Sequence, residues 1–193
     1  MYNNNDIMPA RQTFGSSWAY NFVDWRGDTM PLLEIKQLTK TSLLPKIDLN
    51  INQGQCVAIQ CRRDIGNLLL QLLIGSIPPS EGEILFQGKH LNTDNKSVLQ
   101  QVGVLLLDDR LYERLKVKHY LAFFNRLYGT SQAVDTVIRH IGLADRADTY
   151  CSRLTASEKR RLQIGRCIIH RPQLVIMEAP EQNVDLESRI IIR

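Results

Sequence analysis

Residues 154–181, LTASEKRRLQIGRCIIHRPQLVIMEAPE, decide the fold of this 193-residue chain. Thr155 and the glutamate three residues later have the spacing of a capping box, so a helix is expected to start directly after Thr155. Pro172 marks a turn, because proline does not continue a helix. Leu174–Met177 is then a short apolar strand that ends at the carboxylate of Glu178. Helix, turn, buried strand and acidic residue in this order indicate an α/β protein with a parallel sheet.

The composition is that of an ordinary globular protein, and it excludes several classes of function. Apolar residues make up 44% of the chain and charged residues 23%, and the length is enough for one domain with a sizeable core. No apolar run approaches the ~18 residues that span a bilayer, so a role at a membrane requires a partner. The net charge of +4 is too small to indicate nucleic-acid binding, and we expect no direct contact with nucleic acid.

The cysteines and histidines do not indicate a metal site. The four cysteines contain no C-x-x-C pair, and the four histidines are scattered along the chain. We therefore expect no metal site, and we interpret the cysteines as buried, reduced thiols of a cytoplasmic protein: Cys56, Cys61, Cys151 and Cys167.

Hydrophobic periodicity divides the chain into an irregular start and a regular remainder. Residues 1–29 contain an asparagine run and both tryptophans without sustained periodicity, so we expect a poorly ordered N-terminal extension. In the remainder, the apolar patterns predict half-buried strands over 33–35 and 47–51, fully buried strands over 56–60 and 102–107, and a strand over 83–87. Helical spacing predicts helices over 66–74, 117–128 and 132–141, the last two capped by Gly129 and Gly142.

The quoted segment resembles the signature helix and Walker B strand of ATP-binding cassette (ABC) ATPases. In that family, Leu-Ser-Gly-Gly-Gln precedes a basic helix, and the next strand ends in Asp-Glu-Pro-Thr. Three further matches follow the family's order, namely SIPPSEGEILFQGKHL at 76–91, FFNRLYG at 123–129 and IGLADRAD at 141–148. The resemblance implies a P-loop NTPase-like parallel-sheet core with an antiparallel β subdomain. It also implies a cassette domain over 30–193, with an α-helical subdomain inserted at about 108–152, that ends before the family's C-terminal switch region.

The segment after the predicted strand 56–60 is where the family places its phosphate loop, G-x-x-x-x-G-K-[ST]. Here the window 61–68 reads CRRDIGNL, which retains Gly66 but has Asn67 in place of the lysine and Leu68 in place of the hydroxyl that ligates Mg²⁺. A phosphate loop needs glycines, because its N–H groups must close around the anion. The resemblance therefore implies a degenerate site that binds ATP and Mg²⁺ weakly or not at all.

Two interpretations of this window are open. In the first, Arg62 and Arg63 replace the missing charge and hold an anion near the start of the following helix. In the second, the window only connects a strand to a helix. Asp64 favours the second interpretation, because its negative charge would repel a phosphate.

Most of the other residues that contact nucleotide in the family are also replaced here by residues unsuited to that contact. The resemblance places Leu107 at the Q-loop glutamine, Thr155, Ala156, Ser157 and Glu158 at the signature, Glu178 at the Walker B aspartate, Ala179 at the general-base glutamate and Asp185 in the D-loop. Ala156 and Ser157 would crowd an approaching γ-phosphate, and Glu158 would repel it. Glu178 keeps a carboxylate within reach of a metal or a water, but Ala179 has no group that polarises water.

These residues lead to two main hypotheses for function. In the first, the chain is an ABC-type domain with a degenerate nucleotide site, and it serves as a non-hydrolysing scaffold or regulatory cassette with little or no ATPase activity. In the alternative, it is an ATP-binding subunit that couples ATP binding and hydrolysis to transport through a membrane permease. That alternative requires the phosphate-loop lysine and the Walker B glutamate, and both are absent.

The resemblance also implies partners and a location. The expected partners are a membrane permease or a second cassette subunit, which places the chain in the cytoplasm or at the inner face of the cell membrane. Some relatives with decayed cassettes are fused to DNA-binding output domains, so such a domain is expected only after Arg193 in a longer chain.

Overall fold

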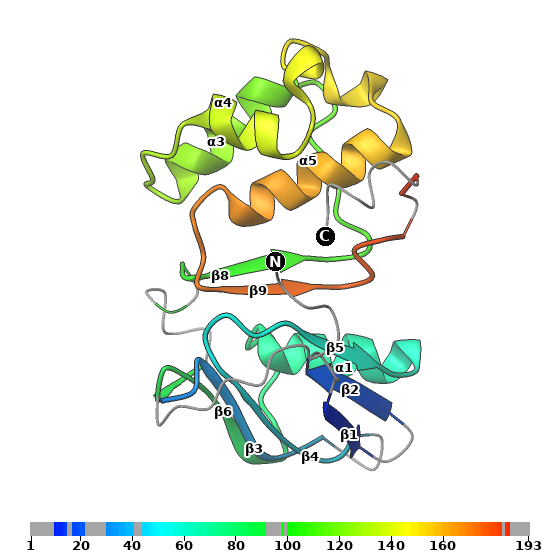
Figure 1. Ribbon diagram of the computed structural model, residues 1–193, viewed down its shortest axis with the longest axis vertical. Coiled ribbons are helices and arrows are strands. Elements are labelled where there is room, and N and C mark those ends of the chain that lie inside the picture. The colour runs from blue at the N-terminus through cyan, green and yellow to red at the C-terminus, as the bar shows by residue number, and fades with distance from the viewer. Residues whose placement is uncertain are drawn as a thin grey trace, which may run out of the picture. The chain divides into compact units, whose positions relative to one another are not determined.

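The computed structural model describes residues 10–14, 17–21, 30–40, 44–91, 98, 100–182 and 184–185. The chain forms two compact units, residues 1–99 and residues 100–193 (Figure 1). In the described residues, the first unit contains the antiparallel strands and α1. The second unit contains α3, α4 and α5 together with one pair of strands.

The first unit contains a four-stranded antiparallel sheet. Its order is β4 (Leu44–Ile51), β3 (Leu33–Lys40), β6 (Glu81–Phe86) and β7 (Lys89–His90). Side chains on one face are buried, because Leu33, Ile35, Ile47 and Leu49 are each at most 6% exposed. The two half-buried strands predicted from the sequence are therefore confirmed, and the strand predicted over 83–87 is present as β6.

β5 (Val57–Gln60) pairs with a strand that the sequence analysis did not predict. Its partner is β2 (Ser17–Asn21), which runs antiparallel to it. On its other side β2 pairs with β1 (Ala10–Phe14). Two segments of the N-terminal extension thus form strands of the first unit.

The expected full burial of residues 56–60 is wrong. Cys56, Ala58 and Gln60 are exposed, and the residues between them are half-buried. A continuous apolar run is fully buried only where both faces of a sheet are covered, and here alternate side chains point to an open face. Of the other cysteines, Cys151 and Cys167 are buried as expected, whereas Cys61 is half-buried.

The predicted parallel sheet is present in the second unit. β8 (Val102–Leu105) and β9 (Leu174–Met177) pair in parallel, with Val102 opposite Leu174 and Leu105 opposite Met177. β8 is shorter than the strand predicted over 102–107, because the chain leaves the ladder after Leu105 and Leu106 is 37% exposed. The apolar character of this strand end therefore does not reflect burial.

α5 (Ala156–Ile168) packs closely on β8 because Gly103 has no side chain. A Cβ at this position would lie 2.4 Å from the carbonyl oxygen of Cys167. Ile164 and Cys167 of α5 form a small buried cluster with Leu105. A glycine in the strand thus sets the distance between helix and sheet.

The two helices predicted between the strands are present as α3 (Val117–Leu127) and α4 (Val134–His140). Gly129 and Gly142 follow them with φ values of +65° and +63°. The N–H of Gly129 donates to the carbonyl of Arg126, and Gly142 bonds to Arg139 in the same way. These are the left-handed C-terminal caps that the sequence predicts.

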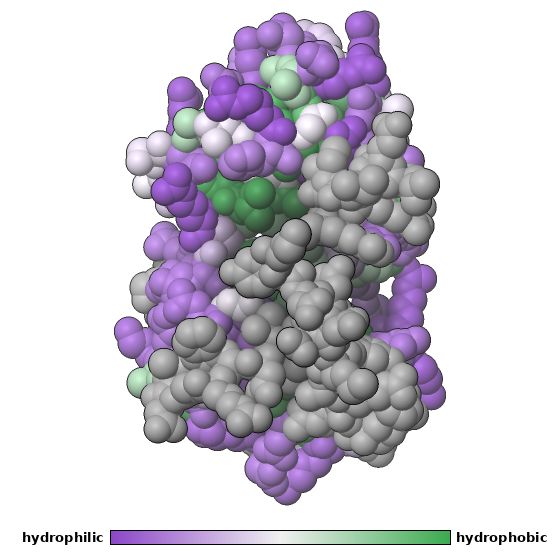
Figure 2. Space-filling view, in the orientation of Figure 1, coloured by the Kyte–Doolittle hydropathy of each residue, from purple (hydrophilic) through white to green (hydrophobic). Residues whose placement is uncertain are grey.

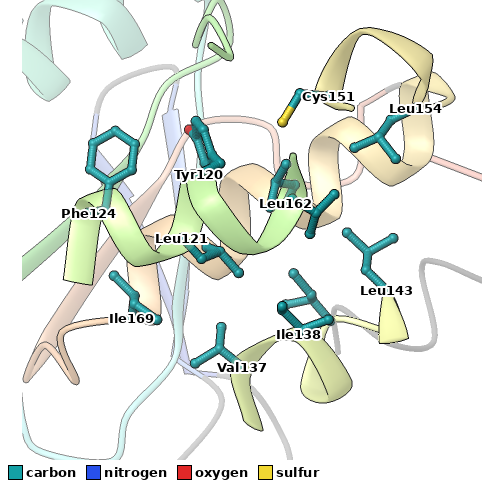
Figure 3. Close-up of a cluster of buried hydrophobic side chains, with 12 residues drawn as sticks. Tyr120, Leu121, Phe124, Val137, Ile138, Leu143, Cys151, Leu154, Leu162 and Ile169 are labelled. Carbon is teal, nitrogen blue, oxygen red and sulfur yellow. The ribbon is translucent and has the colours of Figure 1, made fainter. Parts of the chain in front are cut away.

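The helices of the second unit enclose its main hydrophobic core. Figure 3 shows side chains from α3, α4 and α5 pointing towards one another. Two short 3₁₀ helices, η1 (Ala144–Arg146) and η2 (Cys151–Arg153), connect α4 to α5. The members that are at most 2% exposed are Val117, Tyr120, Leu121, Val137, Ile138, Leu143, Cys151, Leu162 and Ile169.

On the face shown in Figure 2, the described residues are mostly hydrophilic, and hydrophobic side chains are visible on the second unit. Among the described residues, no helix has both the length and the apolar character needed to cross a bilayer.

A buried histidine makes the stability of the second unit sensitive to acid. The ring of His170 is 8% exposed and stacks on Tyr128, with ring centroids 4.0 Å apart and planes 21° from parallel. Burial lowers the pKa of His170, and the backbone of Val102 only partly opposes this effect. His170 is therefore neutral in the folded chain at neutral pH.

We expect the free energy of unfolding to fall as the pH drops below about 6.5. In that range the unfolded chain binds a proton at His170 that the folded chain does not, so each pH unit costs up to about 1.4 kcal/mol. His170→Phe, which keeps a ring against Tyr128, should remove this part of the pH dependence in urea denaturation curves. Replacing the exposed His140 with glutamine is the control. An unchanged pH profile in His170→Phe would contradict the prediction.

Candidate functional site

The window 61–68 is mostly helix rather than loop. α1 (Arg63–Leu73) begins three residues earlier than the sequence predicted, so Gly66 lies inside the helix. The N–H of Gly66 donates to the carbonyl of Arg62 at 2.9 Å and is not free to bind an anion. Asn67 is an exposed residue of the same helix, and Leu68 is half-buried. The backbone of this segment does not form a cradle around a phosphate.

Two of the three charged side chains at the start of α1 pair with each other. The guanidinium of Arg62 forms an ion pair with Asp64, and its Nε donates to the same carboxylate at 3.1 Å. This hydrogen bond lowers the pKa of Asp64, which lies in the first turn of α1. Of the two arginines proposed to hold an anion, Arg62 is thus engaged, and Arg63 remains as an exposed first residue of the helix. The pairing supports the interpretation of the window as a connection.

The residues at the signature position cap the N-terminus of α5. The predicted capping box is confirmed: the N–H of Glu158 donates to Thr155 Oγ1 at 3.2 Å, and the N–H of Thr155 donates to Glu158 Oε2 at 2.8 Å. Arg146 Nε donates to the other carboxylate oxygen at 3.0 Å. Burial raises the pKa of Glu158, but the bonds from Thr155 and Arg146 outweigh it and leave the pKa below its ordinary value.

Ser157, at the signature position, forms a hydrogen bond with Asp185, at the D-loop position. Its side chain is 7% exposed, and its Oγ accepts a hydrogen bond of 2.8 Å from the N–H of Asp185. Ala156, which precedes it, is exposed. The hydroxyl of Ser157 is therefore used in a contact inside the chain.

Glu178 forms hydrogen bonds with residues at the end of the neighbouring strand β8. Its N–H donates to the carbonyl of Leu105 at 2.8 Å, and its Oε2 accepts from the N–H of Leu107 at 2.9 Å. The Walker B and Q-loop positions thus meet through a carboxylate and a backbone amide. Ala179 follows with a left-handed φ of +42° and an exposed methyl group.

The burial of Arg160 was not predicted from the sequence. Charged residues of an amphipathic helix are usually solvated, but Arg160 is only 5% exposed. Its guanidinium donates to the carbonyls of Leu106 at 2.9 Å, Glu178 at 2.5 Å and Ala179 at 3.0 Å. Gln163, a polar residue three positions later on the same helix face, also donates to a backbone carbonyl after β8.

The groups by which the family holds a magnesium triphosphate are largely replaced in this chain. The window 61–68 provides neither a lysine nor a hydroxyl, and Ala179 provides no base. The carboxylate of Glu178 is already bonded to Leu107.

The comparisons with known proteins agree on one family. A family model described as "ABC transporter" matches residues 44–182. The chain is 31% identical over 163 residues to an aliphatic sulfonates import ATP-binding protein, SsuB 2, of Pseudomonas fluorescens, covering 82% of this chain and 59% of that protein. It is 24% identical over 160 residues to the linearmycin resistance ATP-binding protein LnrL of Bacillus subtilis, covering 80% and 51%. The chain thus spans about half the length of these curated relatives.

The solved structures support the predicted fold class. An ATP-binding subunit of an ABC transporter superposes with a TM-score of 0.70 at 19% identity, covering 83% of this chain and 71% of the other. CbiO1 from Clostridium perfringens, described as part of the transporter complex cbiONQ, gives a TM-score of 0.68 at 19% identity and covers 85% and 71%. The fold is P-loop NTPase-like α/β, as expected from the sequence.

We expect Glu178 to contribute to stability without any help from Mg²⁺. Glu178→Ala leaves the Leu107 N–H without its acceptor and should lower the free energy of unfolding by about 1–3 kcal/mol. Glu178→Gln keeps an acceptor oxygen and should cost less. Urea denaturation with and without millimolar Mg²⁺ measures both, with the exposed Glu113→Ala as control. If Mg²⁺ stabilises the unmodified chain but not Glu178→Ala, the residue is a metal ligand and the prediction is wrong.

Proposed function

The chain belongs to the ABC transporter family, and we propose that it is an ATP-binding-type subunit that does not hydrolyse ATP itself. In this role it is a scaffold or regulatory cassette in a transport system. The observation that carries the proposal is the helical window 61–68, in which Asn67 and Leu68 replace the lysine and the hydroxyl.

The missing groups are those on which phosphoryl transfer depends. Catalysis of this reaction is mainly electrostatic, and it needs a cation at the β and γ phosphates and a bound Mg²⁺. Asn67 is neutral and Leu68 has no oxygen. Ala179 cannot position an attacking water, and loss of a general base alone typically costs 10²–10⁴-fold in rate. Together these losses favour a chain without significant turnover.

A second candidate function is an active ATPase subunit that drives transport. It is favoured by the relatives, which are named as import, export or resistance ATP-binding proteins. This function would require Arg63 to supply the missing charge, because Arg62 is paired with Asp64. The two candidates differ in one measurable property, which is Mg²⁺-dependent hydrolysis.

We expect purified chain to hydrolyse MgATP no faster than a buffer blank, because no lysine, hydroxyl or base serves the phosphates. Thermal unfolding in millimolar MgATP should shift little, since binding at 100-fold over Kd would add about 2.7 kcal/mol. An intact cassette subunit is the positive control. Hydrolysis above the blank would favour the transport ATPase. A shift of many degrees that Arg63→Ala abolishes would mean that nucleotide binds through this arginine.

The partner in this proposal is a membrane permease, which places the chain at the cytoplasmic face of the membrane. Three apolar side chains of the second unit suit such a contact: Tyr112 is 52% exposed, Phe123 46% and Leu127 63%. The rings of Tyr112 and Phe123 lie edge to face with centroids 5.6 Å apart, and Leu127 is one turn further along α3. Exposed apolar residues that cluster in this way are typical of contact surfaces.

We expect Phe123→Glu to weaken the contact with the permease, because it places a charge in an apolar interface. The measurement is flotation of purified chain with native membrane vesicles and with protein-free vesicles of the extracted lipids. The unmodified chain should float only with the native vesicles, and Phe123→Glu should reduce this at least about tenfold, equivalent to 1.4 kcal/mol. Tyr150→Glu, at another exposed aromatic residue, is the control. Equal flotation of both variants would contradict the assignment.

A further inference from the structure

The N-terminal strands cover the edge of the strand that leads into the window 61–68. β5 is paired with β2 over the whole length of β5, with Trp18 opposite Gln60 and Asn21 opposite Val57. β1 lies on the outer side of β2, so the order is β1–β2–β5. In the part of the chain that is described, β2 is the only strand that pairs with β5.

The edge that β2 covers would otherwise be open to association. An uncovered strand edge presents a row of free N–H and C=O groups that pair readily with another chain. β5 is four residues long, and its alternate residues Val57 and Ile59 are apolar and only half-buried. A strand with these properties is a template for β-strand addition.

The sequence of the N-terminal segment supports a hairpin independently of the pairing. Two residues, Gly15 and Ser16, separate β1 from β2 in the sequence. A Gly-Ser pair between two short strands is a frequent two-residue hairpin connection. The register agrees with a two-residue connection, because Phe14 is opposite Ser17.

We propose that residues 10–14 and 17–21 are an intramolecular strand pair that occupies one edge of β5 and so prevents the chain from associating with a second copy through that edge. β2 satisfies in cis the backbone groups of β5 that face it. The inference does not depend on whether the chain hydrolyses ATP.

The first experiment removes single backbone donors from β2 in the full chain. Successive residues of a central strand point their N–H groups to opposite neighbours, so one of Ala19→Pro and Tyr20→Pro removes a bond to β5. We expect amide exchange over Val57–Gln60 to rise at least about tenfold in that variant, as a lost 1.4 kcal/mol of protection requires. Exchange in β3 should be unchanged, and Ala10→Pro, at the start of the outer strand, is the matched control.

Sedimentation of the same variants tests the consequence. The variant with exposed β5 amides should form larger species as its concentration rises, whereas Ala10→Pro should behave like the unmodified chain. Association that does not increase, despite faster exchange in β5, would overturn the proposed role. Fast exchange of β5 in the unmodified chain would overturn the pairing itself.

A cross-link keeps the proposal testable if the proline variants do not fold. In a chain with Cys56→Ser and Cys61→Ser, the pair Ala19→Cys and Ile59→Cys places two thiols on directly opposed residues. Mild oxidation should form an intramolecular disulfide in this chain. Ala19→Cys with Gln53→Cys, whose positions are not opposed, should not form one. The same yield from both pairs would overturn the register.

Discussion

The second unit depends on the hydrogen bonds of one buried guanidinium. Arg160 donates from α5 to carbonyls at the ends of both parallel strands, at Leu106 and at Glu178 and Ala179. A buried arginine is costly unless its donors are satisfied, and carbonyl oxygens satisfy them without a second charge. Through these hydrogen bonds the helix and the two strand ends stabilise one another.

A second layer of polar contacts fixes the segment after β8 in the same way. Arg166 forms an ion pair with Asp109, and Gln163 donates to the backbone carbonyl of Asp109. Burial raises the pKa of Asp109, and the nearby Arg166 and Arg160 oppose this effect. α5 therefore holds the strand ends by its polar side chains and the strands themselves by close packing at Gly103. In this chain the carboxyl edge of the parallel pair is occupied by internal contacts, where α/β proteins commonly bind ligands.

The sequence predicted the elements whose signals are local. Capping at Thr155, the glycine caps at Gly129 and Gly142 and the apolar periods of α3 and α4 depend on neighbours along the chain, and these predictions are confirmed. Burial was harder to predict, because it depends on what covers each face. The strand β5 was expected to be fully buried and is not, although its composition is correct for a strand.

The candidate site was predictable in its positions but not in its contacts. Family spacing identified Glu178 and Leu107 separately, but only the structure shows that the side chain of one binds the backbone of the other. The burial of Arg160 was missed because charged residues of an amphipathic helix are usually solvated. The hairpin of residues 10–21 was missed because five-residue strands carry little periodicity, and only the intervening Gly-Ser pair signals it.

The first turns of α1 and α5 each contain a carboxylate. At α1 the first turn contains Asp64, which is paired with Arg62. At α5 it contains Glu158, which accepts from Thr155 and from Arg146. A helix N-terminus favours a negative charge, and an internal carboxylate supplies it without the entropy cost of binding a ligand. The carboxylates of Asp64 and Glu158 therefore stabilise the starts of α1 and α5.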